Sequence, residues 1–250
     1  MPRSHSNLAT RTVSLAALAL FIATLAGCQG VTGIQPTSQV RVIAVSPDAP
    51  ALDMYQSATP IQQNSAALYN IGFGTVSSYI PVAPGPYTHA AYTAGTQQQL
   101  AAVHGSFLSG GQYTILTGNV ASSLQMTVLK DQSTPAPGGD IAIRFLDQTT
   151  RAGAVDLYLL SPGAAPSGVA PIVTAATFGT NTGYISAPAG TYSILAYPTG
   201  TVPSTATVPE YTGSQIAYPS GSARTIILID EPAVHGLQII TASDFDPAAG

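Results

Sequence analysis

Most of this 250-residue chain consists of two similar copies of one sequence pattern. Val40-Arg41-Val42 returns 103 positions later as Ile143-Arg144-Phe145, and Leu52-Asp53-Met54-Tyr55 returns at the same offset as Val155-Asp156-Leu157-Tyr158. Phe73-Gly74-Thr75 returns at an offset of 105, and Leu124-Gln125-Met126 is matched at an offset of 113. The offset only grows, as expected when insertions accumulate in loops. A period of about a hundred residues has the size of a domain and exceeds that of solenoid repeats. The sequence therefore predicts two tandem copies of one small domain.

Both copies consist of short alternating or wholly apolar runs between glycine and proline clusters, which is typical of β-strands. In the first copy we expect strands at 39–45, 51–55, 75–82, 87–92, 113–116 and 124–129. In the second copy the counterparts are 141–146, 155–160, 183–187, 192–197, 225–229 and 237–241. A short helix at 65–69 is a local alternative. Six or seven strands per roughly hundred residues favour an all-β chain with two antiparallel, immunoglobulin-like β-sandwich domains.

The N-terminal segment is typical of a bacterial lipoprotein signal peptide. Arg3 and Arg11 give the segment a positive start. An apolar run over 13–26 follows, which is shorter than the ~20 residues that a membrane-spanning helix needs. The run ends in Leu25-Ala26-Gly27-Cys28, and Cys28 is the one cysteine of the chain. We expect cleavage before Cys28 and lipidation of its thiol, with palmitate among the acyl chains, so that lipid anchors the protein to the membrane. The alternative is an ordinary secretory signal with an incidental cysteine.

Gln29 follows the cysteine. By resemblance to lipoprotein sorting, the absence of aspartate at this position favours the outer membrane of the cell envelope. The protein would face either the periplasm or the cell surface. The predicted order is a signal peptide at 1–27, a tether at 28–38, a first β-sandwich at 39–131, a linker at 132–139, a second β-sandwich at 140–246 and a frayed tail at 247–250.

The charge of the chain excludes one large class of partner. Five cations and eleven acids follow Cys28, so the mature net charge is −6. Because the single lysine leaves no basic patch, a phosphate backbone would be repelled, and we exclude nucleic-acid binding. Charged residues make up 7% of the chain, far below the ~25% that is usual in soluble proteins. This composition suits an exported β-protein better than a cytosolic enzyme.

The candidate site residues are repeated with the copies. Asp53 and Tyr55 lie two apart on an expected strand and share a face, and Asp156 and Tyr158 repeat the pattern. One interpretation is a polar and aromatic patch, present twice, that stacks on a sugar ring. The other, which we favour, is structural: each aspartate pairs with the equally repeated Arg41 or Arg144 on a neighbouring strand.

No sequence motif predicts catalysis, a metal or a cofactor. The chain has no Gly-x-Ser-x-Gly motif, no cysteine other than Cys28, no phosphate loop and no dinucleotide fingerprint. The histidines lack zinc-ligand spacing, and the acids Asp230, Glu231, Asp244 and Asp246 lack the spacing of a calcium loop. We expect no metal and no enzymatic activity, with a dispersed carboxylate hydrolase site as the remaining catalytic alternative.

The first copy resembles a known family. Arg41, Ser46-Pro47-Asp48-Ala49-Pro50, Asp53-Met54-Tyr55, Phe73-Gly74-Thr75, Tyr79 and Gly85-Pro86-Tyr87 are similar to the domain of unknown function 4397 family, and the second copy is similar but looser. The resemblance implies extracytoplasmic, often lipid-anchored β-sandwich proteins, and it carries no assigned activity.

These observations favour a non-catalytic binding or structural module at the envelope, with an envelope protein or a polysaccharide as its partner. Glycan binding through tyrosine stacking is the alternative.

Overall fold

A computed structural model describes residues 36–58, 66–204, 206–232 and 236–247. The predicted signal peptide, Cys28, Gln29 and most of the tether lie outside these residues, as does all of the tail after Pro247. Thr37–Gly250 forms one compact unit. Within the described part, no helix is long and apolar enough to cross a membrane. The regular structure there consists of β-strands and short 3₁₀ turns, so the prediction of an all-β chain is confirmed.

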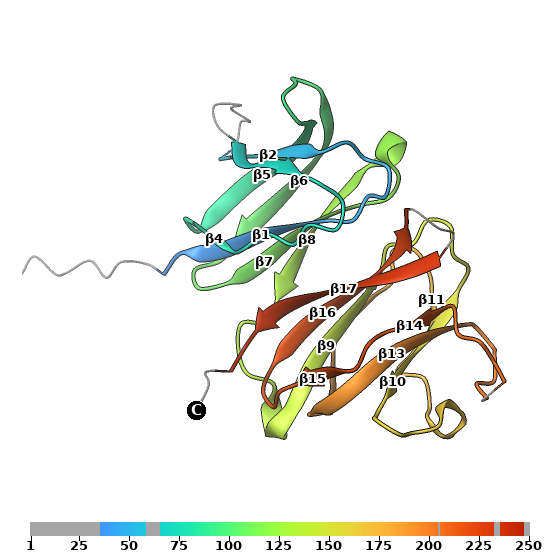
Figure 1. The fold of residues 1–250 in the computed structure, drawn as a ribbon. Coiled ribbons are helices and arrows are strands. Elements are labelled where there is room, and N and C mark those ends of the chain that lie inside the picture. The colour runs from blue at the N-terminus through green and yellow to red at the C-terminus, as the bar shows by residue number, and fades with distance from the viewer. Residues whose placement is uncertain (1–35, 59–65, 205, 233–235, 248–250) are drawn as a thin grey trace, which may run out of the picture. The chain divides into compact units, whose positions relative to one another are not determined.

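The first half of the described chain, residues 38–131, forms two four-stranded sheets (Figure 1). Sheet 1 has the order β4-β1-β7-β8 and contains β1 (Ser38–Ala44), β4 (Ile80–Val82), β7 (Gln112–Gly118) and β8 (Gln125–Asp131). Sheet 2 has the order β3-β2-β5-β6 and contains β2 (Leu52–Ser57), β3 (Ala66–Ile71), β5 (Gly85–Thr93) and β6 (Gln99–Phe107).

The second half, residues 140–245, repeats this arrangement with changes at one edge. Sheet 3 has the order β12-β9-β16-β17 and contains β9 (Asp140–Asp147), β12 (Asn181–Pro188), β16 (Ala223–Glu231) and β17 (Gly236–Phe245). Sheet 4 has the order β11-β10-β13-β14, and β15 also pairs with β13. Its strands are β10 (Val155–Leu160), β11 (Val173–Ala176), β13 (Gly190–Pro198), β14 (Tyr211–Thr212) and β15 (Ile216–Tyr218). The long β6 of the first half is thus replaced by two short strands.

The sheets are not all antiparallel, which corrects the expectation. β1 pairs with β7 in parallel, and β9 pairs with β16 in parallel, whereas the other pairings are antiparallel. Parallel neighbours need a long crossover between them. Here the crossover from β1 to β7, and from β9 to β16, passes through the opposite sheet of the same half.

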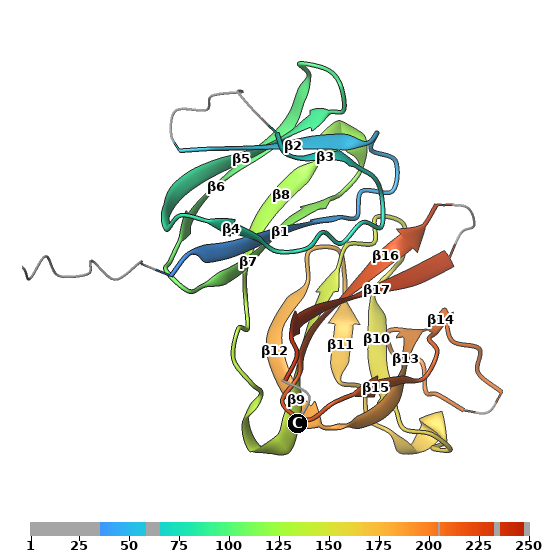
Figure 2. The same cartoon turned by 60° about the vertical axis from the view of Figure 1, so that its left-hand side comes forward.

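Strand alternation explains how the layers form. In β1 the side chains of Val40, Val42 and Ala44 enter the core between sheets 1 and 2. Ile43 and Val45, on the other face, enter a second apolar cluster that also contains residues of β9, β16 and β17. Sheets 1 and 3 therefore pack against each other through the faces that their own cores leave unused (Figure 2).

The segment between the halves, predicted as a linker, is tied to the second half. Ala136 is buried, and its N–H donates to the carbonyl of Gly221 at 3.0 Å. The N–H of Gln132 donates to the hydroxyl of Tyr184 at 3.1 Å.

Candidate functional site

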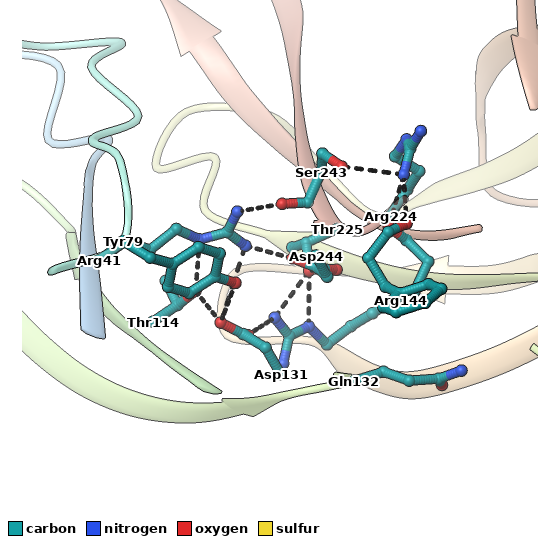
Figure 3. Close-up of polar contacts among 12 residues, drawn as sticks. Arg41, Tyr79, Thr114, Asp131, Gln132, Arg144, Arg224, Thr225, Ser243 and Asp244 are labelled. Carbon is teal, nitrogen blue, oxygen red and sulfur yellow. Dashed lines mark hydrogen bonds and ion pairs between the residues drawn. The ribbon is translucent and has the colours of Figure 1, made fainter. Parts of the chain in front are cut away.

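Arg41 and Arg144 occupy equivalent places in the two halves. The residues on either side of Arg41 in β1 and of Arg144 in β9 point into the core of their own half. Alternation therefore directs both guanidinium groups to the opposite face, between sheets 1 and 3 (Figure 3). There, Nε of Arg41 donates to Oγ1 of Thr114 at 2.9 Å, and Nε of Arg144 donates to Oγ1 of Thr225 at 3.0 Å.

Each arginine also reaches the other half. Nη2 of Arg41 forms an ion pair with Asp244, and Nη2 of Arg144 forms one with Oδ1 of Asp131 at 2.6 Å (Figure 3). The Nη1 atoms donate to the carbonyl oxygens of the residues just before those aspartates, at 2.6 and 3.0 Å. The exchange is reciprocal, as in an isologous interface between two identical subunits.

Two tyrosines complete this reciprocal network. The hydroxyl of Tyr79 donates to Asp131 at 2.7 Å, and that of Tyr184 donates to Asp244 at 2.8 Å. Each ring also lies under the arginine of its own half, with 4.7 and 4.9 Å between the guanidinium carbon and the ring centre. Burial, with repulsion from the neighbouring carboxylate, raises the pKa of both tyrosines, so their hydroxyls remain protonated donors.

The charges of the network are almost entirely removed from water. Arg41, Arg144, Asp131 and Asp244 are each only 2–3% exposed, and their formal charges cancel. Burial raises the pKa of Asp244, while the positive charge of Arg41 opposes that shift. Removing one member of such a set leaves an uncompensated buried charge, so the network acts as a structural joint between the halves.

The expected pairing of Arg41 with Asp53, and of Arg144 with Asp156, is wrong. β1 and β2 belong to different sheets, as do β9 and β10. Because both arginines point away from the core that lies between those sheets, their guanidinium groups are directed away from the aspartates.

Asp53 and Asp156 instead accept hydrogen bonds from backbone N–H groups of neighbouring segments. The two carboxylate oxygens of Asp53 accept hydrogen bonds from the N–H groups of Asn70 and Gly95, both at 2.9 Å. Asn70 lies near the end of β3 and Gly95 in the turn after β5, and both have positive φ, 54° and 71°. Asp156 makes the equivalent two bonds in the second half, at 2.8 and 3.2 Å. In each half the repeated aspartate therefore fixes the end of one strand and one turn.

Tyr55 and Tyr158 lie on the outward faces of sheets 2 and 4, each against a second tyrosine. Tyr55 and Tyr92 meet edge-to-face at 5.0 Å between ring centres, and Tyr158 and Tyr197 meet at 5.5 Å. The second pair is buried, since Tyr158 is 4% and Tyr197 1% exposed. It is packed in a cluster with Leu160, Val169 and Leu195. A sugar therefore has no access to the ring of Tyr158.

Tyr55 is only half-buried, and the reason lies in its cross-strand neighbours. Tyr55 is opposite Ala90, and Ala90 is opposite Ala102 on the next strand. In the second half, Tyr158 is opposite Leu195 instead. Small side chains beside the first ring leave part of its surface uncovered, whereas leucine covers the second ring.

Polar groups flank this open ring. Oγ1 of Thr88 and Nδ1 of His104 are 2.6 Å apart, and the hydroxyl of Tyr92 donates to Oε1 of Gln99 at 2.9 Å. Gln99 and His104 are both exposed. We call Tyr55, Thr88, Tyr92, Gln99 and His104 the Tyr55 face. Its side chains combine an aromatic surface with hydroxyl, imidazole and amide groups.

Sequence reasoning missed several of these residues. Asp131 and Asp244, and likewise Tyr79 and Tyr184, are repeated between the copies, and this repetition was the available signal for the network. Gln99 and His104 gave no signal, because the strand that carries them was not predicted.

One cavity of about 360 Å³ in the second half contains the carboxylates of Glu210 and Asp230 in its lining. Asp230 is already engaged: it accepts hydrogen bonds from the N–H and hydroxyl of Thr150, at 2.6 and 2.7 Å. Its other oxygen lies 3.8 Å from Nε of Arg151. Within the described ranges no three His, Cys, Asp or Glu side chains gather as metal ligands would.

No curated protein matches the chain. One similar solved structure is described as alpha-glucan recognition by family 41 carbohydrate-binding modules from streptococcal virulence factors. The match has a TM-score of 0.26 at 11% sequence identity, and it covers 78% of this chain and 95% of the other chain. Another is the family 26 module of Eubacterium rectale Amy13K in complex with maltoheptaose, at TM-score 0.23, 11% identity and coverages of 84% and 98%. TM-scores this low carry no conclusion about fold or ligand. Residues 38–158 match the family model described as Domain of unknown function (DUF4397), which supports the family expected from the sequence.

Proposed function

We propose that the protein is a non-catalytic binding protein of the bacterial cell envelope, and that it binds a neutral glycan on the Tyr55 face. In this proposal both halves are immunoglobulin-like sandwich domains of the DUF4397 family, arranged in tandem. Lipid on Cys28 anchors the chain to the outer membrane, and the tether at 28–38 holds the domains away from the lipid. The anchor and the location rest on the sequence signal alone.

The observation that carries the binding proposal is the contrast between two equivalent tyrosines. Tyr158 is covered by leucine and valine side chains, whereas Tyr55 is left half-exposed beside Ala90 and Ala102. Covering the part of an aromatic ring that is exposed to water is favourable, because it removes apolar surface from water. A ligand that covers the open ring explains why the first half keeps it uncovered.

The chemistry of the Tyr55 face favours a neutral sugar. A pyranose ring presents C–H groups that stack on an aromatic ring, and hydroxyls that exchange hydrogen bonds with the amide of Gln99 and the imidazole of His104. None of the five side chains that define the face is an acid, a lysine or an arginine. Asp53 shares the strand face with Tyr55, but it is buried, and both of its carboxylate oxygens accept backbone hydrogen bonds. The chain as a whole has an excess of acids, so an anionic polymer is disfavoured.

The test uses the full-length lipidated protein in detergent micelles, with maltoheptaose, cellohexaose, laminarihexaose and chitohexaose as probes in titration calorimetry. We expect saturable binding of at least one probe, a loss of tenfold or more in affinity for Tyr55→Ala, and near-normal affinity for Tyr55→Phe, which keeps the ring. Tyr158→Phe is the matched control, and it leaves binding unchanged because its ring is buried.

The proposal is wrong if no probe binds, or if Tyr55→Ala binds as tightly as the original protein. Capture of an envelope protein that protease treatment abolishes and periodate treatment leaves intact would instead favour a protein-docking module.

A further inference from the structure

The contact between sheets 1 and 3 is symmetric in register. In sheet 1, Leu116 is opposite Ile43 on β1 and Thr127 on β8. In sheet 3, Ile227 is opposite Leu146 on β9 and Ile240 on β17. Each position that one half contributes to the contact thus has a counterpart in the other half, and the two sides of the contact can be compared residue by residue.

One side of the contact is filled by branched aliphatic side chains. Val45 is 1% and Ile229 0% exposed, and Val76 and Ile240 pack against the same apolar cluster. Val45 and Val76 come from the first half, whereas Ile229 and Ile240 come from the second. This side is close-packed, as expected of an apolar interface between two domains.

The other side has small or polar residues at the four equivalent positions. Gln148 takes the place of Val45, Asn181 of Val76, Gly118 of Ile229 and Thr127 of Ile240. Hydrogen bonds fix two of these equivalences: Val45 N donates to the carbonyl of Thr117, and Gln148 N donates to that of Leu228, the counterpart of Thr117 in β16.

These four small or polar residues line a cavity of about 210 Å³ between the halves. Its lining consists of Leu116, Gly118, Gln125, Thr127 and Leu129 of the first half, and Leu146, Gln148, Gly179, Thr180 and Asn181 of the second. No charged side chain lines the cavity. The side chain of Gln148 lies across Gly118, where an added Cβ would collide with Oε1 of Gln148.

Several polar groups of this lining have no protein partner within the described chain. Neither the amide of Gln125 nor the hydroxyl of Thr127 makes a hydrogen bond there. Nε2 of Gln148 donates to the carbonyl of Asp147 at 2.9 Å, which leaves Oε1 as a free acceptor. Oδ1 of Asn181 accepts from the N–H of Gly183 at 3.0 Å, which leaves Nδ2 as a free donor. The cavity therefore offers donors and acceptors over a floor of three leucines.

We infer that this cavity, here named the inter-half pocket, binds one neutral sugar ring or a polyol of similar size. The leucines suit the C–H face of such a ligand, and the amides and hydroxyl suit its hydroxyl groups. A carboxylate, phosphate or zwitterion would find no charged partner in the lining. One water takes about 30 Å³ of liquid, so the pocket of about 210 Å³ has the space of roughly seven waters, which suits a single sugar ring.

Phe178 adds a second difference between the two sides. It directly precedes Gly179 of the lining and is 38% exposed, whereas its counterpart Phe73 packs against the apolar cluster.

The pocket is independent of the Tyr55 face, since that face belongs to sheet 2 and the pocket lies between sheets 1 and 3.

The test measures binding of D-glucose, D-galactose, D-mannose, N-acetyl-D-glucosamine and xylitol to the full-length protein by saturation-transfer NMR, with D-glucuronate as an anionic comparison. We expect saturable binding of at least one neutral probe and at least tenfold weaker binding of glucuronate. Gln125→Ala is expected to weaken the neutral probe by fivefold or more. Gln238→Ala, the same change at the equivalent exposed position of the filled side, leaves its affinity unchanged.

A second variant separates the pocket from the fold. Thr127→Ile with Gln148→Val introduces two of the four apolar residues of the filled side and removes a hydroxyl and an amide from the lining, and we expect it to abolish sugar binding while the melting temperature stays equal or rises. Tyr55→Ala leaves this binding intact, which distinguishes the pocket from the proposed glycan face. The inference is overturned if no neutral probe saturates, or if the double variant binds the probes as the original protein does.

Discussion

At the scale of single residues, His89 shows how burial changes a titration. The ring is 4% exposed, lies 5.2 Å from the ring of Phe107, and its Nε2 has no hydrogen-bond partner in the described chain. Burial lowers the pKa of His89 from 6.5 to about 4. Between these two values the unfolded chain binds a proton at this histidine and the folded chain does not, so stability falls as the pH drops from about 6.5 to 4.

We therefore predict that His89 destabilises the protein by about 3 kcal/mol at pH 4 relative to pH 7. His89→Leu removes this part of the pH dependence, as measured by urea unfolding at several pH values. Substitution of the exposed His104 by Gln is the control for removing a histidine in general. An identical slope for His89→Leu and the original protein would contradict the assignment.

At the scale of elements, the carboxylate of Asp53 connects β2 to the end of β3 and to the turn that follows β5. We predict that Asp53→Ala lowers the free energy of unfolding by roughly 2–4 kcal/mol, because two part-buried backbone N–H groups, one in β3 and one in the turn after β5, lose their acceptor. Asp48→Ala is the control, since its one bond, to the N–H of Ala121, is exposed. Chemical denaturation measures both variants, and equal small losses would show that the turns do not depend on Asp53.

Sequence pattern predicted the strands whose apolar residues are dense. β1, β9 and β10 are found within two residues of the expected bounds, because their two buried faces leave long apolar runs. β6 was missed because its outward positions, such as Gln99 and His104, are polar and exposed, so the strand lacks a strong apolar run.

Two other expectations were altered by tertiary context. A short helix was the local alternative for 65–69, but residues 66–69 belong to β3, whose Leu68 and Ile71 pack on the core beside β2. The predicted strand at 75–82 is reduced to Ile80–Val82, with one isolated bridge from Val76 to Ile43. The immunoglobulin-like description of each half stays a prediction.

Only part of the candidate site could be predicted from the sequence. Repetition identified Arg41, Asp53, Tyr55 and their counterparts as residues with a shared role. The sequence could not give their partners, because the arginines pair across the two halves at separations of up to 203 residues, whereas the prediction paired neighbouring strands of one half.

At the scale of the whole molecule, the chain resembles a homodimer joined into one polypeptide. Each half contributes an arginine, an aspartate, a threonine and a tyrosine to a network in which the arginine of one half pairs with the aspartate of the other. The network is buried beside the apolar cluster between sheets 1 and 3. Unfolding of the two halves is therefore expected to be coupled in one cooperative transition.

The last prediction tests this coupling. Arg41→Met leaves Asp244 buried without its ion-pair partner, and we expect a loss of about 3–5 kcal/mol, with one calorimetric transition separating into two. Arg224→Met is the matched control: its partner Asp246 has a 60% exposed side chain, so the loss is expected to stay within about 1 kcal/mol. Adding Asp244→Asn to Arg41→Met should recover part of the loss, since it removes the unpaired charge. If Arg41→Met cost no more than Arg224→Met and the transition stayed single, the halves would be joined by the apolar cluster alone.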